Sequence, residues 1–69
     1  MKELKAGEWI DTPRFCHVKI KEVFPDEKSA KQAGYKEPTH WNNPDYGCLG
    51  KSLDLYHMEF CAYRKGKTV

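Results

Sequence analysis

Hydrophobic and polar residues alternate along residues 15–24, which have the sequence FCHVKIKEVF. A period of two is typical of a β-strand, because successive side chains of a strand point to opposite faces of the sheet. The alternation places Cys16, Val18 and Ile20 on one face, which we expect to face the core. Pro13 stands just before the segment, where a residue without a backbone N–H suits the entry to a strand.

A second alternating segment, LDLYHMEFCAYRK, covers residues 53–65 and predicts another strand. Its expected core face carries Tyr56, Met58, Phe60 and Ala62. Its other face carries Leu55, His57, Glu59, Cys61 and Tyr63. Further short strands are expected around residues 9–10 or 46–49.

Between these segments, the sequence PDEKSAKQAGY at residues 25–35 predicts a short helix. Asp26 suits the N-cap because its carboxylate can accept a hydrogen bond from a free amide of the first turn. Gly34 can adopt the left-handed conformation that closes a helix, and Ala30 and Ala33 offer a small apolar face. Together, the elements predict one α+β domain over residues 1–69. We expect a small antiparallel sheet of two to four strands, with one short helix packed on one face.

Turn-forming residues concentrate in EPTHWNNPDYGCLG, residues 37–50. Two interpretations of this irregular segment are open. Trp41 and Tyr46 fold back and cap the open end of the core, or the segment contacts a partner protein, since exposed aromatic residues are frequent in interfaces. In the second interpretation the contact residues are Trp41, Asn42, Asp45 and Tyr46.

The chain length of 69 residues is near the lower limit for a domain that folds alone, and such chains often need a disulfide, a metal ion or a partner. Antiparallel pairing of the two predicted strands places Val18 opposite Phe60 or Ala62, and the register with Phe60 brings His17 across from Cys61. Directly opposite Cβ atoms are about 5 Å apart, close enough to share a metal ion. A residue of the turn-rich segment completes a tetrahedral site for one structural zinc ion. The expected ligands are Cys16, Cys48, Cys61, His17 and His40.

The alternative to zinc is that each Cys is a small buried hydrophobic residue and that the His residues lie on the surface. The chain contains no CxxC pair, so the common zinc-ribbon and zinc-finger patterns are absent from its sequence. No apolar run is long enough for a membrane span or a signal peptide. We therefore expect a cytoplasmic protein whose cysteines are thiols or metal ligands and not disulfides.

Charge and motifs narrow the functional classes. Twelve Lys and Arg against ten Asp and Glu give a net charge of +2, which is too balanced to favour a nucleic-acid-binding protein. No paired carboxylates, phosphate-binding glycine loop or serine elbow is present, so we expect no enzyme and no catalytic residue. Two alternatives are kept. One is a thiol- or metal-dependent enzyme, and the other is a nucleic-acid-binding or regulatory module that uses Lys19, Lys21, Arg64 and Lys65.

Residues 35–65 resemble very short proteins of phages and mobile elements of Gram-positive bacteria, in the segments EPTHW, NPDY, LGK and MEFCAYRK. Some proteins of this kind are anti-CRISPR inhibitors of type II effector nucleases, and at least one contains zinc. The resemblance implies a non-enzymatic protein that binds a host protein or ribonucleoprotein and blocks its nucleic-acid loading or activation. It assigns no role to any single residue. A homodimer is a further expectation, because exposed strand edges in a small sheet favour pairing.

Overall fold

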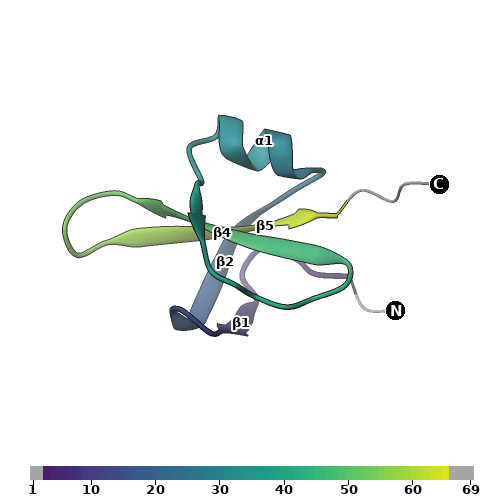
Figure 1. Cartoon of the computed structure of the whole chain (residues 1–69), viewed down its shortest axis with the longest axis horizontal. Coiled ribbons are helices and arrows are strands. Elements are labelled where there is room, and N and C mark those ends of the chain that lie inside the picture. Colours follow the sequence, from purple (N-terminus) through teal and green to yellow (C-terminus); the bar gives the residue numbers. More distant parts are fainter. Residues whose placement is uncertain (1–2, 66–69) are drawn as a thin grey trace.

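The structure, a computed structural model, describes residues 3–65 (Figure 1). Over this range it consists of β1 Trp9–Thr12, β2 Cys16–Phe24, α1 Glu27–Gln32, β3 Glu37–Pro38, β4 Tyr46–Ser52 and β5 Met58–Arg64. The strands form one sheet in the order β1-β2-β5-β4-β3. The predicted combination of a small sheet with one short helix is confirmed, while the described part has more strands than the two to four expected. No helix within it is long and apolar enough to cross a membrane.

The two strands predicted from alternation, β2 and β5, are neighbours but run parallel. The expected antiparallel pairing and both expected registers are therefore wrong, because Ile20 lies opposite Phe60 and Val23 lies opposite Ala62. The reason lies in the segment between the two strands. Helix α1, β3 and β4 carry the chain across the sheet, and β4 then pairs with β5 in an antiparallel hairpin. Parallel neighbours require such a crossover, which a sequence period does not reveal.

Helix α1 is fixed at both ends by the predicted residues. The backbone N–H of Ser29 donates to the Asp26 carboxylate at 2.7 Å, which makes Asp26 the N-cap. Gly34 has φ of +102°, the left-handed conformation expected after the helix. Ala30 is fully buried, but Ala33 is exposed at the C-cap. The small apolar face expected from both alanines is therefore limited to Ala30, because the helix ends before Ala33.

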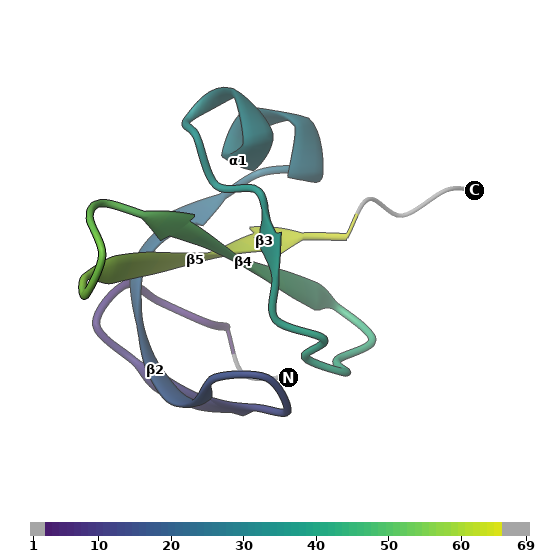
Figure 2. The ribbon, with the colours of Figure 1, turned by 60° about the vertical axis from the view of Figure 1, so that its left-hand side comes forward.

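The central strands β4 and β5 are covered on both faces (Figures 1 and 2). Helix α1 lies over one face, where the helix-side core consists of Ala30, Tyr35, Leu49 and Cys61, with Phe24 and Tyr63 packed against it. The β1–β2 hairpin curls under the other face. The hairpin-side core there consists of Val18, Ile20, Tyr46, Cys48 and Ala62. The expected division of the last strand into a core face and an outer face is therefore wrong, since α1 buries the second face.

The turn between β1 and β2 closes onto β3, at the far edge of the sheet. The backbone N–H of Arg14 donates to the carbonyl of Thr39 at 3.4 Å, and its guanidinium donates to the carbonyl of Pro38 at 3.1 Å. Cys16 ends this turn with φ of +60° and is exposed. Its expected core position is therefore wrong, because the strand starts irregularly, whereas Val18 and Ile20 are buried as predicted.

Candidate binding loop

Residues 53–57, which join β4 to β5, form a loop that projects beyond the sheet (Figure 1). We call it the tip loop. Its apolar side chains are exposed: 91% of Leu55, 89% of Tyr56 and 51% of Leu53 are accessible to solvent. A single exposed apolar residue is ordinary on a protein surface. Of the four large hydrophobic side chains that are exposed within residues 3–65, three lie in this five-residue loop, and such clustering marks it as a candidate contact surface.

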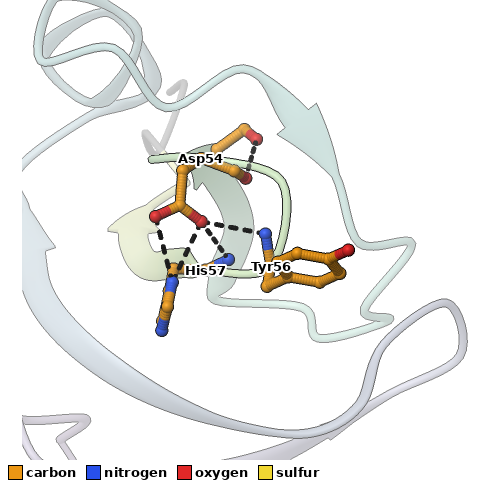
Figure 3. A network of polar contacts seen from close by, with 4 residues as sticks. Asp54, Tyr56 and His57 are labelled. Atoms are coloured by element: carbon orange, nitrogen blue, oxygen red, sulfur yellow. Dashed lines mark hydrogen bonds and ion pairs between the residues drawn. The ribbon is translucent and has the colours of Figure 1, made fainter.

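Asp54 holds the backbone of the tip loop in one conformation (Figure 3). One oxygen of its carboxylate accepts hydrogen bonds from the backbone N–H groups of Tyr56 and His57, each at 2.9 Å. The loop closes where the N–H of Leu53 donates to the carbonyl of His57 at 2.9 Å. An Asp side chain that bonds the amides two and three residues ahead is a common way to fix a turn. The loop is therefore ordered by its own hydrogen bonds.

The charge of Asp54 supports the same geometry. The pKa of its carboxyl is lowered from 3.8, first by the backbone N–H of Tyr56 and then by the side chain of His57. The imidazole Nδ1 of His57 lies 2.9 Å from the carboxylate. Both side chains are exposed, so solvent screens this ion pair and it adds little stability. The backbone hydrogen bonds to the carboxylate carry most of the order.

The groups that the tip loop offers for binding are its apolar side chains. The N–H groups of Tyr56 and His57 are bonded to Asp54, and the ring of Tyr56 points away from that carboxylate (Figure 3). An aromatic side chain on a fixed backbone loses little conformational entropy when it binds. The tip loop is therefore suited to insertion into an apolar depression of another macromolecule.

Residues 39–45, between β3 and β4, form a second irregular segment that we call the capping segment. Asn43 accepts hydrogen bonds from the backbone N–H groups of Asp45 and Tyr46, at 2.8 and 3.0 Å. Tyr46 is only 7% exposed and belongs to the hairpin-side core, and Trp41 is partly buried and packs against that core. Trp41 and Tyr46 thus have the capping position described by the first interpretation of this segment. Asn42 is exposed next to them.

The four predicted basic contact residues do not gather in one place. Lys19 and Lys21 lie on β2 near the start of β5, whereas Arg64 and Lys65 lie at its other end. Three of the four are engaged. Lys21 is 2.8 Å from Glu59, Arg64 is 3.4 Å from Glu3, and Lys65 donates to the carbonyl of Asn43 at 2.7 Å. Within the described residues, Lys19 makes no ion pair.

The five residues expected to bind zinc are also separated. Cys48 and Cys61 lie on adjacent strands but on opposite faces, in the hairpin-side and helix-side cores. His17 is 2.9 Å from Asp11 of β1 and not beside Cys61, because the pairing that was expected to join them is wrong. His40 and Cys16 are exposed. Among residues 3–65 no group of three His, Cys, Asp or Glu side chains is placed to hold a metal ion, and zinc binding stays a prediction.

The buried thiols are chemically quiet. Burial raises the pKa of the Cys61 thiol to about 12 and also raises the pKa of the Cys48 thiol. Neutral thiols inside a core are poor nucleophiles, because the thiolate is the reactive form. Both residues match the alternative reading of cysteine as a small buried hydrophobic side chain.

Searches of protein-family models, curated proteins and solved structures give no match to this chain. The candidate site is therefore defined by the geometry of the tip loop alone, which the alternation of the sequence did not single out. Leu55, Tyr56 and His57 were expected inside a strand, yet β5 begins at Met58. The local signal was Asp54, an efficient turn former placed within the alternating segment.

Proposed function

We propose that this chain is a non-enzymatic binding protein that contacts a protein partner through the tip loop. The observation that carries the proposal is the exposure of Leu55 and Tyr56 together on a backbone that Asp54 holds in place. Complete burial of an apolar side chain of this size contributes about 1.5–3 kcal/mol. Two such side chains together would contribute about 3–6 kcal/mol to an interface.

The chemistry of the loop favours a protein partner over a nucleic acid. Leu53 and Leu55 fit apolar depressions of proteins, whereas single strands are bound by stacked aromatic residues together with a basic groove. Asp54 adds a negative charge that repels phosphate. The cations Lys21 and Arg64 are already paired with carboxylates and are therefore less available to phosphate.

A host nuclease is the concrete target for this proposal. The resemblance of residues 35–65 to small phage proteins suggests a type II CRISPR effector, inhibited by blocking its nucleic-acid loading or activation. A cleavage assay tests this target directly. The protein is added to the nuclease before or after guide RNA, and cleavage of a matched DNA is measured. Undiminished cleavage in both orders excludes this target and leaves the role of the tip loop to a separate test.

The role of the tip loop is tested with the double variant L55S/Y56S. Its matched control is K28Q, a substitution of an exposed residue on α1, on another part of the surface. Tagged wild type, double variant and control are incubated with lysate of cells that contain an intact type II CRISPR system, and captured proteins are quantified by mass spectrometry. We expect a partner that the wild type and K28Q retain equally and the double variant loses at least about tenfold. Equal capture by all three contradicts the proposal, provided that their melting temperatures agree.

A further inference from the structure

A shallow groove lies beside the base of the tip loop. It has a volume of about 490 Å³ and forms where the N-terminal turn meets β2 and the start of β5. Ala6, Met58 and Phe60 contribute apolar lining. Gly7 adds no side chain to the lining, and nothing is within 4 Å of the position that a Cβ would occupy there. The groove is therefore not obstructed at Gly7.

Backbone hydrogen bonds hold the groove in shape. The N–H of Gly7 donates to the carbonyl of Ile20 at 2.7 Å, and the N–H of Ile20 donates to the carbonyl of Glu8 at 2.8 Å. These two bonds tie the N-terminal turn to β2. A preformed groove costs less conformational entropy on binding than one that must be assembled.

The charges around the groove leave one cation without a counter-charge. Lys21 and Glu59 both line it, but they lie 2.8 Å apart and neutralise each other. Lys19 also lines the groove and makes no ion pair within residues 3–65. Glu8, next to Gly7 in the chain, accepts a hydrogen bond from the backbone N–H of Lys5 at 3.3 Å. The groove therefore combines an apolar floor with one unpaired positive charge.

Trp9 extends this surface. It lies directly opposite Lys19 in the β1–β2 ladder and is 63% exposed. Directly opposite residues project from the same face of a sheet, with Cβ atoms about 5 Å apart. Tryptophan is enriched among residues that dominate protein interfaces. On the other side, Met58 of the groove follows His57 of the tip loop, so the groove and the loop form adjoining surfaces.

We infer that the groove binds a segment of the partner protein in which an acidic residue stands next to a large apolar residue. The apolar side chain lies on Met58 and Phe60, and the carboxylate pairs with Lys19 beside Trp9. This inference rests on the proposed function, because it names the chemistry of the same protein partner. The unpaired positive charge of Lys19 favours an acidic occupant of the groove, and the apolar floor favours a peptide over a nucleic acid.

A random peptide library provides the probe for this inference. Twelve-residue peptides are selected on the immobilised protein, and the selected sequences are compared with the unselected library. We expect enrichment of Asp or Glu beside Leu, Ile, Phe, Met or Trp. Binding of a selected peptide is then followed by ¹H–¹⁵N NMR, in which the Trp9 indole and the amides of Gly7, Lys19 and Met58 should shift. Selection without acidic enrichment, or shifts confined to other residues, overturns the inference.

Two variants and one competitor separate the possible outcomes. K19Q should weaken binding of the selected peptide about fivefold to tenfold, the size expected for loss of one favourable contact in an interface, whereas K28Q should leave it unchanged. This assay uses only the isolated protein and the selected peptide, so its result does not depend on whether the tip loop retains a cellular partner. Unchanged affinity in K19Q contradicts the inference. A twelve-nucleotide oligothymidylate that shifts the same signals more strongly than the peptide, and depends on Lys19, would show instead that the groove binds single-stranded nucleic acid.

Discussion

The capping segment and the tip loop use the same local device with opposite results. In each, one side-chain oxygen, of Asn43 or of Asp54, accepts hydrogen bonds from the amides two and three residues ahead. In each, one of the two donating amides belongs to a tyrosine, but Tyr46 is buried and Tyr56 is exposed. Tyr46 opens β4 over the hairpin-side core, whereas Tyr56 lies beyond the last β4–β5 pair, Ser52 with Met58. Local hydrogen bonds thus fix the backbone, and the position relative to the core decides whether the aromatic ring is structural or available.

The largest difference is expected between the two tyrosines. Tyr46→Ala should lower the free energy of unfolding by about 3–4 kcal/mol, because it leaves a cavity in the hairpin-side core. Tyr56→Ala should change it by less than about 0.5 kcal/mol, because its ring contacts mostly solvent. Urea unfolding followed by circular dichroism measures both. Similar losses for the two variants would show that Tyr56 packs against the fold.

The two turn residues should differ less strongly. Asn43→Ala leaves two partly buried backbone N–H groups without their acceptor and should cost about 1–2 kcal/mol of unfolding free energy. Asp54→Ala should leave the urea midpoint nearly unchanged, since its turn is exposed, but should broaden or shift the NMR amide signals of Tyr56 and His57. An unchanged midpoint for Asn43→Ala would mean that Trp41 and Tyr46 alone order the capping segment.

A smaller gain is expected in the capping segment at His40. This residue has φ of +63°, a conformation that side chains with a Cβ adopt at a cost. His40→Gly removes that strain, partly offset by the greater flexibility of glycine in the unfolded chain. The net expectation is an increase of about 0.5–1 kcal/mol in unfolding free energy, measured by urea denaturation. Its control is His57→Gly in the tip loop, where no positive φ is relieved and no gain should follow.

The smallest effect is a response of the tip loop to acid. The native pKa of the Asp54 carboxyl lies below its ordinary value of 3.8, so its contribution to loop order is present above that value. The contribution is lost as the pH falls through the lower native pKa. The amide signals of Tyr56 and His57 should therefore titrate together with a midpoint below 3.8. In Asp54→Asn, which keeps the turn but has no carboxyl, this titration should vanish. A midpoint at or above the ordinary value contradicts the hydrogen-bonded loop.

Local features of the fold could be predicted from the sequence. Alternation located β2 and most of β5, and Asp26 and Gly34 marked the two ends of the helix, because each of these signals depends on neighbouring residues alone. The parallel pairing of β2 with β5 could not be predicted in this way. Strand β4 has the sequence YGCLGKS, and its residues from Tyr46 to Gly50 are all buried. Because both of its faces are covered, its sequence does not alternate between hydrophobic and polar residues.

The errors about the site follow from the same limit. The expected zinc ligands depended on an antiparallel register that placed His17 beside Cys61. Once β5 is parallel to β2 and α1 covers its second face, Cys61 becomes a core residue. The tip loop was missed because Leu55 and Tyr56 continue the alternation of the strand. Asp54 lies just beyond the last pair of β4 with β5. Only the position of the loop beyond the core shows that Leu55 and Tyr56 are exposed.

The position of β5 in the sheet has a consequence for the order of folding. In the described sheet, strands β2 and β4 are joined by hydrogen-bonded pairing only through β5, which follows both of them in the chain. Before β5 is in place, the β1–β2 hairpin and the β3–β4 pair have no shared sheet, and each alone is too small to be stable. Contacts between β2 and β5 also join residues about forty positions apart, as in Ile20 with Phe60, and such distant contacts slow folding. During synthesis the chain should therefore stay unfolded until β5 has left the ribosome, and then fold in a single cooperative step.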